Sequence, residues 1–442
     1  MTKNLENLFY YIILSLPIAF ISVSALINLS TILLNLIFII HIFYNKNFFF
    51  LKEHKAFFLL IIVFIIYQII NNIINNNAHN NLKSISYVRF LIIPIIMKYF
   101  FYRVSLDIKK ISKIYIIIFI LLVIDLIFQY IFNFNILNFK PGLYNPDGHF
   151  YERYAGMFNQ ELVMGGFLGS FGFLSILFYF QLNKKNKYLF YPSLLILFFA
   201  ILITGERAST LSFFISIFFI FLFIKEQRKY LFLTSISLII LTIVSMSFSN
   251  QLKLRYMNYP LRVLGIETNY EQEDKNLNLR IKKIYSKKIK LRESVENFSQ
   301  NSHWGHHYRT AYAMFKDKPF NGYGFKQYRL ICANYSYLFK NEKTLKETDI
   351  NNGCSTHPHN YILELMSEQG IIGVIIFFLI IFYYVNNVLK IKDNKVLKLM
   401  ILSLLLSYLF PFKPSGSIIS TWYSSTFWFM LGFMYLNLKI KN

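Results

Sequence analysis

The sequence predicts an all-α polytopic membrane protein with about 12 transmembrane helices and one large external loop that contains short helices. Three observations support this fold class. Hydrophobic residues make up 55% of the 442 residues and charged residues 15%, whereas an ordinary soluble domain carries about 25% charge. The mean hydropathy is +0.43. The apolar residues also gather in stretches of about 20, the length that crosses a bilayer. This composition excludes a disordered or collagen-like chain and a disulfide scaffold, and it argues against a soluble enzyme.

Twelve segments meet the length requirement for a membrane span. Lys3 is the only basic residue before the first apolar stretch, and a small-residue site near Ala25 could end a signal peptide. We interpret the first segment as an uncleaved helix. The expected spans are 8–27, 30–45, 56–75, 85–102, 112–134, 157–181, 188–204, 208–225, 230–248, 361–389, 396–412 and 418–438.

Basic residues alternate between the short loops and thereby give an orientation. The loops expected on the cytoplasmic side contain Lys46, Lys52, Lys55, Arg103, Lys109, Lys110, Lys184, Lys185, Lys187, Lys225, Arg228, Lys229, Lys390, Lys392, Lys395 and Lys398, and the tail contains Lys439 and Lys441. The opposite short loops contain only Lys83, Lys140, Arg153, Arg207 and Lys413. The positive-inside rule then places both chain ends in the cytoplasm. Most of the net charge of +24 follows from this topology and requires no nucleic acid.

One polar segment, residues 249–358, interrupts the series of spans and is expected outside the membrane. It divides the chain into nine helices over 1–248, a loop domain over 249–358 and three helices over 359–442. A loop of this length between membrane helices is usually functional. Its stretch from Lys275 to Arg292 predicts an amphipathic basic helix, which is either solvated or lies on an anionic lipid surface. The sequence contains no internal repeat, which argues against a transporter.

Two outer junctions carry polar residues that are out of place beside a membrane. Arg207 lies between two spans, on the side where this protein avoids basic residues. An arginine there can hold a phosphate through two parallel hydrogen bonds, and we favour this role over a snorkelling anchor. Arg153 and Glu161 lie at another outer junction. Glu161 either pairs with Arg153 or Arg207 or binds a substrate.

The end of the loop carries His357, His359 and Asn360 where a span begins. His359 is a candidate base because imidazole titrates near neutral pH. Two histidines make a metal conceivable, but a third ligand at suitable spacing is missing, so we expect no metal and no other cofactor. Gly370 and Gly373 follow in the same span, where small residues allow close approach of a neighbouring segment.

Two further features lie in the loop. A short helix is expected to start before Arg309 and to stop at Pro319, and a glycine-containing turn follows it. An arginine on such a helix is normally solvated. The two cysteines, Cys332 and Cys354, either form a disulfide in an oxidising compartment or remain buried thiols. A bond across this separation would stabilise the loop by roughly 3 kcal/mol in the chain-entropy model.

Taken together, these clusters resemble the O-antigen ligase and polymerase superfamily over about residues 150–435. The R-x3-L element of the ligases is matched by Arg207 and Leu211. Their H-N-x9-G-x-x-G element is matched by His359, Asn360, Gly370 and Gly373. The block from Arg309 to Gly324 is similar to the family's loop helix. Glu206 departs from the pattern, since many relatives have serine beside the arginine.

The resemblance implies a bacterial inner-membrane glycosyltransferase with its active site facing the periplasm. Such an enzyme transfers a glycan from a polyprenyl diphosphate to an acceptor hydroxyl, without metal or nucleotide. Arg207, Arg309 and Arg153 would stabilise the leaving diphosphate, and His359 would accept the proton of the acceptor. The acceptor is a lipid A core sugar in a ligase, a growing chain in a polymerase, or a protein hydroxyl. Both ligase spacings are present, so ligase is the leading interpretation; a lipid-linked sugar flippase and a non-catalytic scaffold are the rivals from other classes.

Overall fold

The computed structural model describes residues 2–22, 24–104, 106–144, 151–159, 161, 163–182, 189–258, 260–261, 302–339, 353–390 and 395–436. The first half of this part contains α1 (Thr2–Ile21), α2 (Ser24–Tyr44), α3 (Phe48–Glu53), α4 (Lys55–Ile74), α5 (Asn81–Leu91), α6 (Ile93–Phe101), α7 (Ile108–Phe132), α8 (Met164–Phe167) and α9 (Phe173–Leu182). The second half contains α10 (Phe190–Ile203), α11 (Arg207–Phe223), α12 (Arg228–Phe248), α13 (Asn250–Lys253), α16 (His303–Asp317), α17 (Tyr328–Ile331), the 3-10 helix η7 (Cys332–Phe339), α18 (Tyr361–Lys390), α19 (Lys395–Tyr408) and α20 (Thr421–Phe433).

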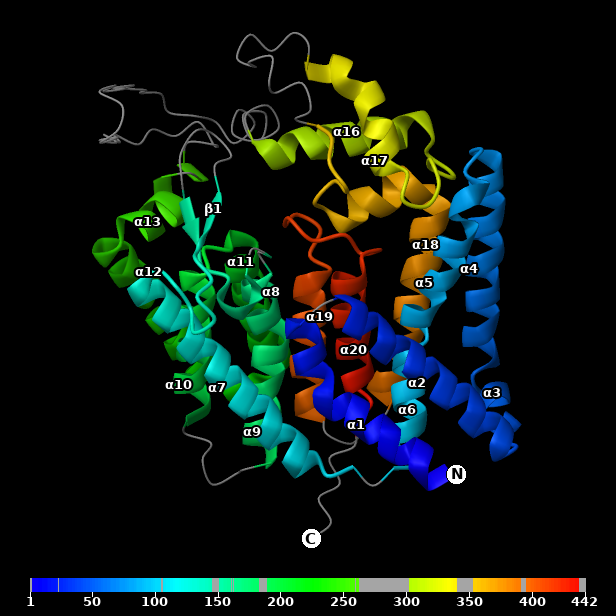
Figure 1. Cartoon of the computed structure of the whole chain (residues 1–442), viewed down its shortest axis with the longest axis horizontal. Coiled ribbons are helices and arrows are strands. Elements are labelled where there is room, and N and C mark those ends of the chain that lie inside the picture. The colour runs from blue at the N-terminus through cyan, green and yellow to red at the C-terminus, as the bar shows by residue number, and fades with distance from the viewer. Residues whose placement is uncertain are drawn as a thin grey trace.

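The long helices form a bundle, and α16 and α17 lie across one end of it (Figure 1). The N-terminus lies at the other end. We name these the α16 end and the opposite end. The expected basic helix from Lys275 to Arg292 falls outside the described residues, and the three-part division of the chain stays a prediction.

Eight helices in the described part of the chain are long and apolar enough to cross a membrane. They are Thr2–Ile21, Ser24–Tyr44, Lys55–Ile74, Ala78–Phe101, Ile108–Phe132, Met164–Leu182, Lys225–Phe248 and Tyr361–Lys390. The other four expected spans fall on the shorter helices α10, α11, α19 and α20, of 14, 17, 14 and 13 residues. The helical, multi-span fold is therefore confirmed, whereas the number twelve is not.

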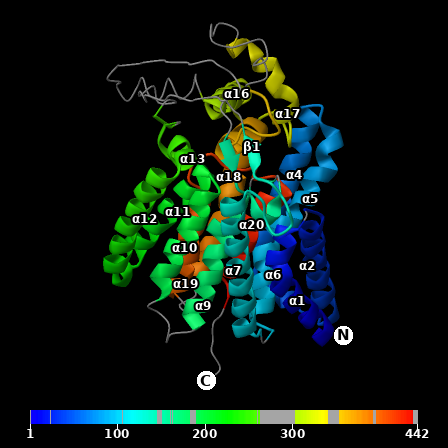
Figure 2. The same ribbon diagram turned by 60° about the vertical axis from the view of Figure 1, so that its left-hand side comes forward.

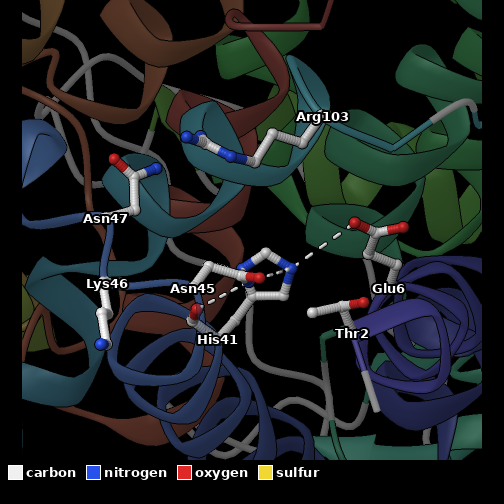
Figure 3. Close-up of a pocket in the computed structure, with 7 residues that line it drawn as sticks. All are labelled: Thr2, Glu6, His41, Asn45, Lys46, Asn47 and Arg103. Atoms are coloured by element: carbon white, nitrogen blue, oxygen red, sulfur yellow. Dashed lines mark hydrogen bonds and ion pairs between the residues drawn. The ribbon is translucent and has the colours of Figure 1, made fainter.

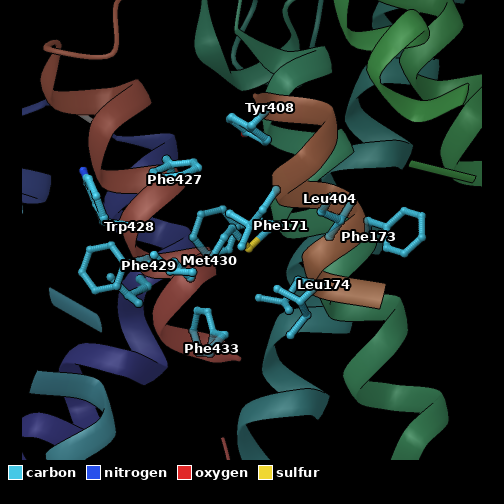
Figure 4. Close-up of a cluster of buried hydrophobic side chains, with 14 of the residues drawn as sticks. Phe171, Phe173, Leu174, Leu404, Tyr408, Phe427, Trp428, Phe429, Met430 and Phe433 are labelled. Atoms are coloured by element: carbon cyan, nitrogen blue, oxygen red, sulfur yellow. The ribbon is translucent and has the colours of Figure 1, made fainter. Parts of the chain in front are cut away.

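One of these shorter helices, α20, is buried along most of its length. Every residue of α20 from Tyr423 to Phe433 is buried, as expected of a helix that is surrounded by other helices on all sides. Figure 4 shows its Phe427 and Phe433 on the side of α9 and α19, whereas Trp428 points the other way and packs on Phe377 and Tyr384 of α18. In contrast, α12 lies at the edge of the bundle (Figure 2) and buries few of its residues. The bundle thus has a central helix that is protected from lipid.

A short antiparallel pair of strands, β1 (Gly142–Tyr144) and β2 (Tyr151–Arg153), adds to the expected all-α fold. Arg153 pairs with Gly142 in this hairpin. The hairpin follows α7 and ends beside the junction of α10 and α11, which is described below.

An asparagine corner holds the turn around Gly322 and Phe325 on the bundle; it is formed by Asn71 and Asn72 at the end of α4 and by Asn75, Asn77 and Asn80 directly after it. Asn72 Oδ1 accepts a hydrogen bond from the Phe325 amide at 3.1 Å, and Asn75 Nδ2 donates to the Gly322 carbonyl at 3.2 Å. Asn77 and Asn80 both donate to the Phe325 carbonyl. Backbone groups of a turn that would otherwise be unsatisfied are therefore paired by side chains of the bundle.

The same turn touches α18 backbone to backbone. α18 is kinked at Gly370, where φ is 58°, and a Cβ there would lie 2.3 Å from the Phe320 carbonyl oxygen. A Cβ on Gly322 would lie 2.5 Å from the Glu368 carbonyl carbon. The Gly324 amide donates to the Glu368 carbonyl at 2.7 Å. The glycines at 322 and 370 thus allow an approach that any side chain would prevent.

Candidate functional site

The first part of the site is the junction of α10 and α11. Gly205, with φ of 70°, turns the chain, and Arg207 is the first residue of α11. The Arg207 guanidinium carbon lies 5.2 Å from the centroid of the Trp304 ring. Trp304 belongs to α16, so the loop domain reaches Arg207 through a cation–π contact.

Glu206, the departure from the family pattern, is buried in this junction. Its carboxylate accepts hydrogen bonds from the amides of Gly165 and Gly166, at 2.9 and 3.3 Å, and from the Ser209 hydroxyl at 2.9 Å. Burial raises the pKa of Glu206, while the nearby Arg153 and the hydrogen bonds lower it. Glu206 therefore ties the start of α8 to α11 and places a carboxylate beside Arg153.

Glu161 is not the buried carboxylate of this junction. It is exposed, and within the described residues it forms no ion pair with Arg153 or Arg207. The buried carboxylate within electrostatic range of Arg153 is that of Glu206. A role of Glu161 in substrate binding stays a prediction.

A further arginine, Arg255, was not singled out by the sequence. It is 5% exposed, and its Nε donates to the Gly205 carbonyl at 2.8 Å. A Cβ placed on Gly205 would lie 3.8 Å from Arg153 Cγ and 3.4 Å from Arg255 Nε. Arg153, Arg207 and Arg255, which we name the arginine group, thus surround one turn. The sequence signal that could have identified Arg255 is its position soon after a predicted span, on the expected outer side.

The second part of the site lies where α18 begins. Asn360 caps this helix, since its Oδ1 accepts from the Leu363 amide at 3.1 Å. Its Nδ2 donates to the Pro411 carbonyl at 2.6 Å. His359 precedes the cap with φ of 53°. The adjacent His and Asn of the motif therefore combine a candidate base with the residue that fixes the helix start.

Three histidines, which we name the histidine group, gather at this point. The His359 ring centroid lies 4.3 Å from that of His357 and 5.1 Å from that of His307. Burial, with a contribution from Arg329, lowers the pKa of His357 to about 4, so His357 is neutral at physiological pH. His307 is fully buried and lies some fifty positions away along the chain, so the sequence did not associate it with His359. In the described part of the chain, no three His, Cys, Asp or Glu residues are arranged to hold a metal ion.

The loop between α19 and α20 closes over the histidine group. The Ser415 amide donates to the His359 carbonyl at 2.8 Å. Glu364, buried in α18, accepts from the Ser417 hydroxyl at 2.5 Å and from the Ile418 amide at 2.9 Å. One turn further along, Glu368 accepts from the amides of Lys326 and Tyr328. The sequence signal that could have predicted these contacts is the pair of carboxylates, Glu364 and Glu368, four positions apart in an apolar helix.

The same loop contains a buried cation, Lys413. It is 5% exposed, and burial lowers its pKa to about 7. The Asn360 Nδ2 lies 3.5 Å from its carbonyl oxygen, and its Nζ lies 5.5 Å from the centroid of the Tyr408 ring. Lys413 therefore lies in the loop that closes over the histidine group, with its ammonium beside Tyr408.

The helix α16 connects the two groups. Trp304 touches Arg207, His307 lies beside His359, and the Tyr308 hydroxyl donates to the His359 carbonyl at 3.4 Å. Positions 304, 307 and 308 share one helix face. Arg309 follows on this helix, and its Nη2 donates to the Leu338 carbonyl at 2.9 Å. The structure therefore places Arg309 on the connecting helix, with η7 as a partner of its guanidinium.

The two cysteines are joined. Cys332 and Cys354 form a disulfide with a Cα–Cα distance of 5.1 Å, which resolves the alternatives that the sequence left open. Cys332 lies at the start of η7, and Cys354 lies shortly before His357. The bridge thus ties the residues that pack against α16 to the segment that leads into the histidine group.

Comparison with known proteins gives the same family as the motifs. Residues 192–378 match the O-antigen ligase family. A candidate polysaccharide ligase of Rickettsia felis is 34% identical over 79 residues, which is 17% of this chain and 18% of that relative. The matched region contains Arg207, Arg309, His359 and Gly370. Over residues 192–378, this chain is therefore similar to the O-antigen ligase family.

Proposed function

We propose that this protein is a metal-independent glycosyltransferase, which moves a glycan from a polyprenyl diphosphate to an acceptor hydroxyl at the periplasmic face of the bacterial inner membrane. The observation that supports it best is the connection of the arginine group to the histidine group by one helix, α16, at one end of the bundle. A transfer of this kind needs two functions side by side: stabilisation of a departing anion and acceptance of a proton.

The arginine group supplies the first function. A lipid diphosphate is a good leaving group, but negative charge develops on it as the bond to the sugar breaks. Guanidinium groups stabilise such charge and hold diphosphate oxygens bidentately. Arg207 is our main candidate, with Arg309 and Arg153 as additional diphosphate ligands. We assign Arg255 a positioning role, since its Nε is bound to the Gly205 carbonyl beside Arg207.

The histidine group supplies the second function. The acceptor hydroxyl loses a proton as it attacks the sugar carbon, and His359 is the proposed base. His357 has a pKa of about 4, too low for an effective base at neutral pH, and we assign it and Asn360 to positioning. Attack opposite the diphosphate would invert the anomeric configuration.

We add Lys413 to the proposed site. Lys413 is buried in the loop that closes over the histidine group, and a bound diphosphate would favour its charged form. Lys413 would then add a compact positive charge close to the reacting bond. This contact with the donor differs from those of the planar guanidinium groups.

O-antigen ligase, with a lipid A core sugar as acceptor, is the activity that we favour. Both the matched family and the name of the Rickettsia felis relative refer to ligases. O-antigen polymerase and protein O-oligosaccharyltransferase use the same donor chemistry and are the alternatives within the superfamily.

The test is a deletion strain whose surface glycans are resolved on a gel. Loss of a ligase leaves finished polymer on its lipid carrier, whereas loss of a polymerase leaves a core with one repeat. A matching assay uses the purified protein, a polyprenyl-diphosphate-linked glycan and a lipid A core acceptor in the presence of EDTA. Transfer under these conditions supports the proposal. Absence of transfer to any hydroxyl acceptor, with lipid-linked sugar crossing a vesicle membrane instead, would identify a flippase.

A further inference from the structure

A polar pocket of about 570 Å³ lies at the opposite end of the bundle, far from the proposed catalytic groups (Figure 3). The start of α1, the end of α2 and the turn after α6 form it. All of its lining residues are polar: Thr2, Glu6, His41, Asn45, Lys46, Asn47 and Arg103. A polar hollow between membrane helices is unusual, because buried helix faces in a bundle are otherwise filled with apolar side chains.

The floor of the pocket is a fixed hydrogen-bond network around His41, which is 3% exposed. Its Nδ1 lies 2.8 Å from the Tyr99 hydroxyl and 3.0 Å from Asn45 Nδ2. Its Nε2 lies 3.5 Å from Glu6 Oε1, and Figure 3 shows the ring between Asn45 and Glu6. The carboxylate of Glu6 is therefore engaged with the floor of the pocket.

The rim of the pocket is basic. Lys46 and Arg103 are both exposed, and the Arg103 guanidinium carbon is stacked 4.1 Å from the centroid of the Tyr99 ring. Lys46 is held in a left-handed turn with φ of 49°, directly after α2. The lining thus has two cationic side chains and one carboxylate, which is engaged by His41, and this balance of charge favours an anion.

Exposed aromatic side chains place this opening at a bilayer surface. Phe43 and Tyr44, on the last turn of α2, are 63% and 57% exposed, and Phe49, on α3, is 75% exposed. Phe43 packs on Phe48 of α3. Aromatic residues next to cations at the end of membrane helices are typical of the headgroup region, and large exposed apolar side chains there would be covered by lipid.

We propose that this pocket binds the phosphate-bearing headgroup of an anionic glycerophospholipid in the leaflet opposite to the proposed catalytic site. Basic pockets between helices on the cytoplasmic side bind such headgroups. Lys46 and Arg103 would contact the phosphate, and Asn45, Asn47 and Thr2 would donate to the neighbouring oxygens. This proposal is independent of the glycosyltransferase proposal, because neither its residues nor its leaflet are shared with the catalytic groups.

The experiment is native mass spectrometry of the full-length protein after extraction, titrated with phosphatidylglycerol or phosphatidylcholine. We expect one phosphatidylglycerol to be retained preferentially. The double variant Lys46→Gln, Arg103→Gln should weaken this binding by about 30-fold, from the contribution of two basic residues near the membrane surface. Asn47→Trp, which obstructs the pocket without a change in charge, should weaken it as well.

The matched control is Lys52→Gln, Lys55→Gln, which removes two exposed lysines from the same end but outside the pocket. It should bind phosphatidylglycerol like the unaltered protein. An equal loss in the control and the pocket variant would mean that only general surface charge attracts the lipid, and the proposal would fall. Displacement of the lipid by millimolar glycerol phosphate, with stabilisation of lipid-free protein, would identify a soluble ligand instead and would also overturn it.

Discussion

The position of His359 depends on its backbone. Its φ of 53°, the bonds of its carbonyl with Ser415 and Tyr308 and the helix cap at Asn360 all remain when the imidazole is removed. The side chain can therefore be altered while the surrounding structure stays in place, which makes this residue suitable for a test of chemistry.

We predict that His359→Ala lowers the transfer rate by about 10²–10⁴-fold, the usual contribution of a general base. Expression and thermal unfolding should be near those of the unaltered protein. His357→Ala, the control within the histidine group, should be milder because its own pKa of about 4 makes it a poor base. Rates from membranes with matched protein levels measure both. Near-normal transfer by the His359 variant would refute the assignment.

For Arg207 the prediction concerns shape as well as charge. Arg207→Lys should be nearly as damaging as Arg207→Ala, about 10²–10³-fold in rate, because lysine keeps the charge but loses the planar fork. Arg309→Ala should also reduce turnover severely. The measurement is kcat with a lipid-diphosphate-linked donor. If the Arg207→Lys variant kept close to the original rate, Arg207 would be only a membrane anchor.

Lys413 gives a prediction about pH. Its pKa is lowered to about 7 in the folded protein from an ordinary 10.5, so its ammonium is charged below pH 7 and is lost as the pH rises through that value. The KM for the donor should therefore increase between pH 6 and pH 8. Lys413→Arg, charged throughout this range, should flatten the dependence of KM, and Lys413→Met should give a high KM at every pH. A steep dependence that persists in the Met variant would exclude Lys413 as its source.

At the scale of elements, the turn at 319–324 and the kink in α18 are one structural unit. Gly370 has a positive φ, and a Cβ built on it would lie 2.3 Å from the Phe320 carbonyl oxygen, so a side chain meets both backbone strain and overlap. The spacing between Asn360, which caps α18, and Gly370 determines which turn of α18 the segment 319–324 contacts. The H-N-x9-G-x-x-G motif therefore determines where the turn at 319–324 packs on α18, in addition to supplying a candidate base.

Gly370→Ala should accordingly destabilise the protein by about 2–5 kcal/mol, from left-handed strain and overpacking together. The matched control is Gly169→Ala, where the nearest atom to a new Cβ is Ile201 Cδ1 at 3.9 Å, and little change is expected. Thermal unfolding of both variants in the same detergent measures the difference. Equal stability of the two would contradict the close approach.

The sequence predicted the elements better than the contacts between them. Apolar length located the long helices, because the bilayer requires it, and the two motifs singled out Arg207 and His359 as candidate site residues. The asparagine corner could not be predicted, since asparagine is abundant throughout the chain and only the fold brings Asn72 to Phe325. His307 and Arg255 were missed for the same reason: their partners are distant in sequence. For Glu161 the sequence left an ion pair with Arg153 or Arg207 and substrate binding open, and it did not indicate that the buried carboxylate near Arg153 is that of Glu206.

At the scale of the whole molecule, the topology makes a prediction about accessibility. The charge distribution predicts that the α16 end lies outside the cell membrane and the opposite end inside. In the described chain both native cysteines are bonded to each other, so introduced thiols can be labelled selectively. Lys316→Cys, exposed on α16, should react with a membrane-impermeant maleimide in intact spheroplasts. Lys109→Cys, exposed at the start of α7, should react only after permeabilisation. The reverse pattern would invert the topology.

The closure of the histidine group by the loop between α19 and α20 has a consequence for biosynthesis. Asn360, Glu364 and the His359 carbonyl all bind partners in that loop, which the ribosome makes after every other part of the proposed site. A nascent chain that has inserted α18 but not the last two helices holds the arginines and histidines without the backbone partners that fix them. Such a chain should be inactive, so the reaction cannot begin on an incompletely inserted protein.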